Sequence, residues 1–197
     1  MKQIQFTKGC PNQCAYCYEQ AEMEYLDPDI PQGEKLVQIL DMNFLANPNF
    51  EEHIVNLMEA NNKNYELICG IDFRRLNQDI CNMLHNARFI KMRWAWDYNF
   101  GQQRLHQMTL RMLVKAGYQP RDLSVFILAN WKIPYSDCLQ KLDLLKVWNC
   151  KVNDCCYDGG YKIAKPQYWN IDQIKNFRKK CRKHNQLVRF KIDPEFK

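Results

Sequence analysis

Residues 3–17 read QIQFTKGCPNQCAYC, and this stretch decides the fold and the chemistry expected of the chain. Its first part, Gln3–Thr7, is rich in residues that favour β-strands. Its second part places Cys10, Cys14 and Cys17 within eight residues, in the loop that follows this strand. Thiols clustered in this way are typical of metal or iron–sulfur sites.

Five more strand-forming segments follow, and amphipathic segments lie between most of them. The strands are expected at Leu36–Leu40, Tyr65–Ile71, Arg88–Trp94, Leu123–Leu128 and Lys151–Tyr157. Helices are expected from Asn47 as N-cap with Pro48 in the first turn, over Asn77–Ala87, before a C-terminal Gly117, after Pro134, and from Ile171 to Cys181.

Strand starts spaced by about 30 residues are typical of strand–helix–strand units. The sequence therefore predicts an α/β fold with a parallel sheet, either a partial barrel of six units or an open doubly wound sheet. Six units are too few for the closed eight-stranded barrel. Both architectures place their chemistry at the C-terminal ends of the strands.

The composition indicates one globular domain over residues 1–197, because 46% of the residues are hydrophobic and Gly and Pro number only 7 and 8. There is no run of 18 apolar residues and no apolar secretory leader at the start, so we expect a cytoplasmic protein without a membrane segment. The ten cysteines then indicate metal or redox chemistry rather than disulfides.

Charge is divided unevenly along the chain. Residues 1–60 carry a net charge of −7 and residues 61–197 a net charge of +13, which together give the overall +6. The densest basic run extends from Lys175 to Lys183. It is interpreted either as a solvated helix face or as a surface for nucleic acid or another polyanion.

The cysteine spacing lacks a fourth nearby ligand. A closed structural zinc site needs four ligands, as does a ferredoxin-type cluster, so three cysteines leave one iron of a cluster open. The alternative is a zinc site completed by a distant Cys or His.

With Tyr16 just before the third cysteine and a strand before the loop, the motif resembles the radical S-adenosylmethionine superfamily. The resemblance implies a compact, core-only enzyme with a partial (β/α)6 barrel fold, a [4Fe-4S] cluster on Cys10, Cys14 and Cys17, and S-adenosylmethionine on the open iron. It also implies reductive cleavage to a 5′-deoxyadenosyl radical that takes hydrogen from a substrate, and an electron donor such as flavodoxin or ferredoxin. The substrate is unknown, and the basic C-terminal helix favours a nucleotide, a nucleic acid or another anionic substrate.

The same resemblance assigns residues near strand ends to S-adenosylmethionine. In place of the family's Gly-Gly-Glu, the chain offers Asp41 and Asn43 for the ammonium group. The third strand is followed by Asp72, Arg74 and Arg75, of which either arginine is a candidate for the carboxylate. Further candidates are Asp97 for the ribose hydroxyls, and Trp96 and Tyr16 for stacking or contact with adenine.

Each assignment has a structural alternative. Asp41 and Asp97 could cap helices, the arginines could be surface charges, and Trp96 could belong to the core. Cys155 and Cys156 at the end of the last strand are candidate hydrogen donors to a substrate radical, or simply structural thiols. For the whole protein, the alternatives are a non-catalytic zinc or iron–sulfur module and a glycyl-radical-enzyme activase, the latter weakened by the missing Gly-Gly-Glu.

Overall fold

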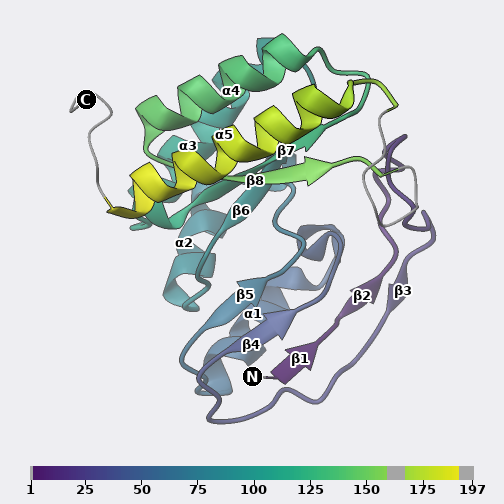
Figure 1. Ribbon diagram of the computed structural model, residues 1–197. Coiled ribbons are helices and arrows are strands. Elements are labelled where there is room, and N and C mark those ends of the chain that lie inside the picture. The colour runs from purple at the N-terminus through teal and green to yellow at the C-terminus, as the bar shows by residue number, and fades with distance from the viewer. Residues whose placement is uncertain (1, 159–166, 191–197) are drawn as a thin grey trace. The chain divides into compact units, whose positions relative to one another are not determined.

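The computed structural model describes residues 2–158 and 167–190, in which strands and helices alternate as in an α/β protein (Figure 1). The chain divides into two compact units. Unit 1 comprises the residues up to Trp94 together with Thr109–Tyr118, and unit 2 comprises Ala95–Met108 and the residues from Gln119 onward. The single domain expected over the whole chain stays a prediction.

Unit 1 is built on a parallel sheet of β1 (Lys2–Ile4), β4 (Val37–Ile39) and β5 (Tyr65–Leu67), in the order β1-β4-β5. Side chains of apolar type at matched positions, such as Ile39 and Leu67, are buried in its core. The helical elements of this unit are η1 (Phe44–Ala46), α1 (Phe50–Glu59), η2 (Phe73–Arg75) and α2 (Gln78–Asn86).

Residues 5–36 form no helix, although helices follow the later strands. They contain instead a short antiparallel pair, β2 (Thr7–Lys8) with β3 (Glu24–Tyr25), which the sequence analysis missed. A two-residue ladder has no periodicity by which it could be recognised. This pair matters because it brackets the segment that holds the three cysteines.

Unit 2 is built on a sheet with the order β6-β7-β8, formed by β6 (Arg93–Trp96), β7 (Ser124–Ala129) and β8 (Lys151–Cys156). Strands β7 and β8 pair in parallel. Helices α4 (Tyr135–Trp148) and α5 (Ile171–Phe190) lie side by side against this sheet (Figure 1). Two short helical turns, η3 (Phe100–Gln102) and η4 (Pro120–Asp122), complete the unit, and the chain changes units within β6 and within α3 (Gln103–Lys115).

The α/β class and the parallel sheets are confirmed, and the described residues form no closed barrel. The fourth strand begins at Arg93 rather than Arg88, because Arg88 and Lys91 have φ angles of 63° and 53° that interrupt an extended chain. Helix α1 begins at Phe50, two residues beyond the predicted first turn, whereas Gly117 follows α3 at φ 115° as expected of a C-terminal cap.

None of the helices in the described ranges has both the length and the apolar character needed to cross a bilayer.

Candidate functional site

The three cysteines lie in a loop that is closed at its base by backbone contacts. The β2–β3 pair joins the two sides, and the Cys10 N–H donates to Gln20 O at 2.8 Å. Gly9 lies at this base with φ 82°, and a Cβ there would stand 1.9 Å from Glu22 O. Only glycine satisfies both the left-handed conformation and the close approach. The sequence thus folds residues 10–20 into a loop between β2 and β3.

All three thiols are half-buried, and two of their sulfurs accept N–H groups. The Asn43 side-chain amide donates to Cys10 Sγ at 3.9 Å, and the Glu19 N–H donates to Cys17 Sγ at 3.4 Å. Such N–H···S contacts are those that surround cluster-ligating sulfurs and influence their potential. In the part of the chain that is described, no three Cys, His, Asp or Glu side chains converge as metal ligands. Tyr16 lies half-buried in the same loop.

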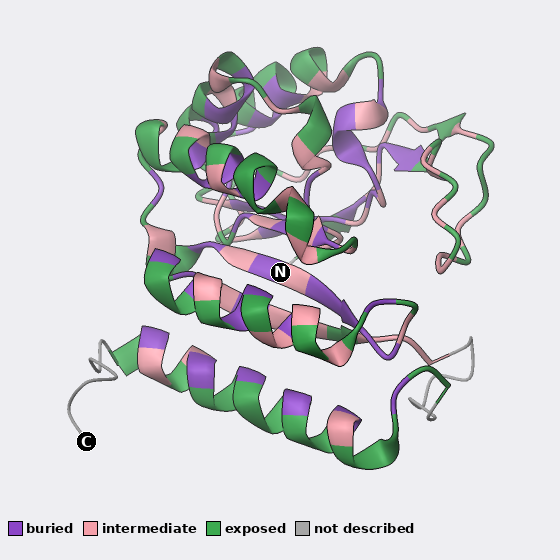
Figure 2. Ribbon diagram, turned by 90° about the horizontal axis from the view of Figure 1, so that it is seen from above, coloured by how far each residue is buried: buried purple, intermediate pink, exposed green. Residues whose placement is uncertain are grey.

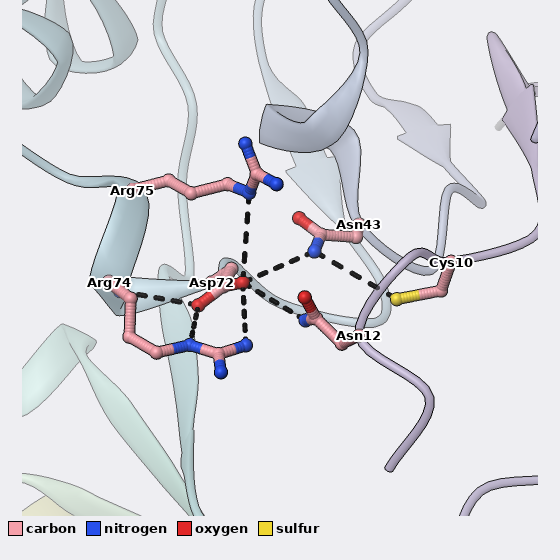
Figure 3. Close-up of polar contacts among 6 residues, drawn as sticks. All are labelled: Cys10, Asn12, Asn43, Asp72, Arg74 and Arg75. Atoms are coloured by element: carbon pink, nitrogen blue, oxygen red, sulfur yellow. Dashed lines mark hydrogen bonds and ion pairs between the residues drawn. The ribbon is translucent and has the colours of Figure 1, made fainter. Parts of the chain in front are cut away.

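Asp72 connects this loop with Arg74 and Arg75, the two arginines predicted to bind a carboxylate group (Figure 3). Its Oδ2 accepts from the Asn12 amide at 3.0 Å and from the Asn43 amide at 3.3 Å. The Arg74 guanidinium pairs with both carboxylate oxygens, at 2.8 Å each. Asp72 also caps η2 by accepting from the Arg74 N–H at 3.2 Å. The structure therefore brings Cys10, Asn43, Asp72 and Arg74 into one polar cluster.

The side chain of Asp72 is only 7% exposed, and its partners hold it in the charged form. Burial by itself raises the pKa of this carboxyl, but the hydrogen bonds from Arg74 and Asn12 outweigh burial, so its pKa lies below the ordinary value. Asp72 is thus a permanent anion that holds its neighbours, rather than a group that exchanges protons near neutral pH.

The two arginines are not equivalent. The fork of Arg74 is engaged by Asp72, whereas Arg75 approaches Asp72 through Nε alone, at 3.8 Å. The terminal nitrogens of Arg75 have no hydrogen bond to any of the described residues, and its side chain is 44% exposed. Of the two arginines predicted to bind a carboxylate, Arg75 is therefore the one whose terminal N–H groups are available to a ligand.

Asp41 and Asn43, predicted to bind an ammonium group, are both buried, and each has an oxygen without a hydrogen-bond partner among the residues that the structure describes. Asp41 Oδ2 accepts from the Phe6 N–H at 3.0 Å, while its Oδ1 has no hydrogen bond to any residue in 2–158 or 167–190. Burial raises the pKa of Asp41, and the Phe6 hydrogen bond offsets this in part. Asn43 uses its amide hydrogens on Asp72 and Cys10, which leaves Oδ1 without a donor. Buried acceptors of this kind usually have a partner, and an ammonium group would supply one.

Cys69, which the sequence analysis counted among the scattered cysteines, lies in the same surroundings. Burial raises the pKa of its thiol most, and the negative charges of Asp41, Glu19 and Cys17 raise it further. Its Sγ contacts Leu40 O at 3.8 Å. Cys69 is 52 residues from Cys17 in the sequence, and this spacing does not indicate that the two belong to one site. Asn12 was missed because a single asparagine in a loop has no sequence pattern that indicates a function.

The remaining candidates belong to unit 2. Trp96 is fully buried and stacks on His106, with ring centroids 4.5 Å apart, and on Trp148 at 5.9 Å. Its Nε1–H donates to Asn99 O at 3.1 Å, and the Lys141 ammonium lies 5.5 Å from its ring centroid. This packing favours the core alternative for Trp96 over contact with adenine.

The other three unit 2 candidates follow or end strands. Asp97 comes directly after β6 and is half-buried. Cys155 and Cys156 end β8 and pair in register with Leu128 and Ala129, so their side chains point to opposite faces of the sheet. Cys155 is exposed and Cys156 half-buried, and their roles as hydrogen donors stay predictions.

Comparison with known proteins gives no assignment: no protein-family model matches the chain, and no curated protein is similar to it.

Proposed function

We propose that this protein is a radical S-adenosylmethionine enzyme whose [4Fe-4S] cluster is held by Cys10, Cys14 and Cys17. The observation that carries the proposal is the closed loop itself, which places three thiols after the first strand of a parallel sheet with N–H donors on two of the sulfurs. The finer fold expected with this activity is a partial (β/α)6 barrel, and the expected setting is the cytoplasm with flavodoxin or ferredoxin as electron donor.

The donor set suits such a cluster in type and number. Three thiolates would bind three irons of the cluster, and the N–H groups of Asn43 and Glu19 would stabilise the negative charge on the sulfurs of Cys10 and Cys17. For all three to act together, the thiols of loop 10–17 must turn toward one point. When bound, the cluster and S-adenosylmethionine would supply the electron and the 5′-deoxyadenosyl radical, and the protein supplies position and exclusion of water.

The chain's own residues then have distinct tasks. The unpaired oxygens of Asp41 and Asn43 accept hydrogen bonds from the ammonium group of the methionine portion. The terminal nitrogens of Arg75 bind its carboxylate, while Asp72 and Arg74 hold the loop and the arginine turn in place. In this reaction a hydrogen atom would pass from the substrate to the 5′-deoxyadenosyl radical. Cys155 and Cys156 stay the sequence-based candidates for giving a hydrogen atom to the substrate radical, and the thiyl radical so formed would need one electron and one proton from the electron donor.

Anaerobic reconstitution tests this function. We expect the reconstituted protein to hold about four irons and to form 5′-deoxyadenosine from S-adenosylmethionine and dithionite. The variant Cys14→Ala should lose both properties. Cys81→Ala is the matched control, because Cys81 is a buried thiol of α2 outside the loop, and it should keep them. Equal nucleoside formation by Cys14→Ala and the unaltered protein would contradict the proposal.

The position of Cys69 favours a second candidate, a structural zinc site with Cys69 as fourth thiol. Cys69 lies in the same unit as the cysteine loop, and its half-buried Sγ contacts Leu40 O at 3.8 Å, beside Asp41. A closed zinc site takes four ligands and leaves no open position for a substrate. The variant Cys69→Ser separates the two candidates: a zinc site would lose a ligand and its metal, whereas a three-cysteine cluster would keep its iron and its nucleoside formation.

A further inference from the structure

The exposed face of α5 carries positive charges that the fold does not neutralise. Figure 2 shows this face exposed and the opposite face, which packs toward the sheet, buried. Of the cations on the helix, Arg178 pairs with Asp154 at 3.2 Å. Between Lys175 and Lys183, five others are exposed and form no ion pair with any residue of the ranges 2–158 and 167–190: Lys175, Lys179, Lys180, Arg182 and Lys183. Arg189, in the last turn, is exposed too, and its guanidinium lies 5.5 Å from the Phe190 ring centroid.

Three of these cations form a row along the helix. Lys175, Lys179 and Lys183 are spaced by four residues, which at 1.5 Å per residue puts them on one side over about 12 Å. Like charges at this spacing repel one another and weaken a helix. A polyanion laid along the row would reverse that repulsion, because each of its charges would lie opposite a lysine.

An aromatic cluster lies just before α5 in the same unit. Trp131 contacts Tyr157 and Tyr168, with ring centroids 4.5 Å and 5.1 Å apart. Trp131 and Tyr157 follow the C-terminal ends of β7 and β8 and are half-buried, and Tyr168 is 45% exposed. Lys132 adds a cation 5.9 Å from the Trp131 ring centroid.

This aromatic cluster is held in place by Asn130. Its Oδ1 accepts from the N–H groups of Gln167, Tyr168 and Trp169 at 3.1 to 3.3 Å, and its Nδ2 donates to Tyr157 O at 2.8 Å. The half-exposed rings are therefore fixed before any ligand arrives, which lowers the entropy cost of binding a flat group.

We propose that unit 2 binds single-stranded nucleic acid, with phosphates along the α5 row and bases on the cluster of Trp131, Tyr157 and Tyr168. Cationic tracks combined with aromatic rings are the means by which proteins bind single strands without sequence preference. A single strand is favoured over a duplex because only unpaired bases can stack on side chains. An anionic membrane is disfavoured because apolar residues occur on the exposed face only at its ends, as Ile171 and Phe190.

Salt dependence of binding tests the cationic row. A fluorescein-labelled 20-nucleotide oligothymidylate is titrated with the full chain, and the dissociation constant is measured by anisotropy at increasing KCl. Five phosphate contacts predict a slope of log K against log salt of about −3.5. The triple variant Lys175→Gln, Lys179→Gln, Lys183→Gln should reduce the slope by about 2. The matched control Lys2→Gln, Lys63→Gln, Lys115→Gln removes the same charge from exposed positions elsewhere and should leave the slope unchanged.

Stacking is tested separately through Tyr168→Leu. This variant should weaken binding about 5- to 150-fold, the range found for loss of one base–aromatic stack, without altering the salt slope. Equal slopes for the two triple variants would overturn the inference, as would tighter binding to phosphatidylserine vesicles than to the oligonucleotide. The inference does not rest on the proposed enzymatic function: Cys14→Ala should bind the oligonucleotide like the unaltered protein, so either idea can fail without the other.

Discussion

Replacing Asp72 by alanine should destabilise unit 1 far more than the loss of an exposed carboxylate does. The variant leaves the amides of Asn12 and Asn43 without their shared acceptor, and hydrogen bonds to a charged acceptor contribute roughly 1.5 kcal/mol each or more. The Arg74 pair adds little, at most about 1 kcal/mol, because the arginine side chain is half exposed. Relief of the buried carboxylate offsets part of the loss, which leaves an expected cost of about 3 kcal/mol.

Thermal and urea unfolding measure this cost. A loss of about 3 kcal/mol corresponds to a fall in Tm of roughly 6–12 °C for a chain of this size. Asp143→Ala is the matched control, because its side chain is 71% exposed and pairs only with Lys146, and it should change stability by less than about 0.5 kcal/mol. Equal stability of the two variants would refute the central role of Asp72.

The difference in unfolding free energy between the unaltered protein and Asp72→Ala should disappear in acid. Asp72 has a pKa below the ordinary value, so the stability that it contributes is present above the unfolded pKa of about 4. That contribution is lost as the pH falls through the lower folded pKa, because the folded state must then take up the proton that the unfolded state has already bound.

Three further variants test other features. Asp41→Asn should flatten the pH dependence of unfolding above pH 4, because the raised pKa of the buried Asp41 makes the folded state lose stability as the pH rises through that value. Gly9→Ala should open the cysteine loop and speed its proteolysis, whereas Gly33→Ala, also at positive φ but with no neighbour within 4 Å of a Cβ, should cost only about 1 kcal/mol. Lys141→Met should cost about 2 kcal/mol in urea unfolding, because the fully buried ammonium donates to two backbone carbonyls that would lose their partner.

Much of the fold could be predicted because apolar, strand-forming runs and helical periodicity depend on local sequence. The segments near residues 3, 36, 65, 123 and 151 all proved to be strands, and the last two match almost to the residue. The strand after Phe89 is displaced because Arg88 and Lys91 adopt left-handed φ angles. Arginine and lysine rarely adopt positive φ, so the sequence does not predict this conformation as a glycine or an asparagine would.

The candidate site was harder to predict, since it depends on contacts between distant segments. The strand ends pointed to Asp72 and Asn43, whose side chains form a hydrogen bond in the structure, but the direction in which the Arg74 guanidinium points follows from tertiary packing. Trp96 shows the same limit: its position at a strand end suggested a ligand contact, and only the surrounding rings reveal that it is buried. Cys69 could not be connected with Cys17 from spacing at all.

The position of Asn130 has two requirements, one on the backbone conformation and one on the side chain. Its backbone has φ 56°, which glycine, asparagine and aspartate adopt most readily, and its side chain must also accept three N–H groups while donating one. Glycine lacks the amide, and aspartate cannot donate, so no other amino acid meets both requirements. Among related sequences, Asn130 should therefore vary less than its neighbours. A substitution of Asn130 should occur only where the segment that it binds, residues 167–169, also differs.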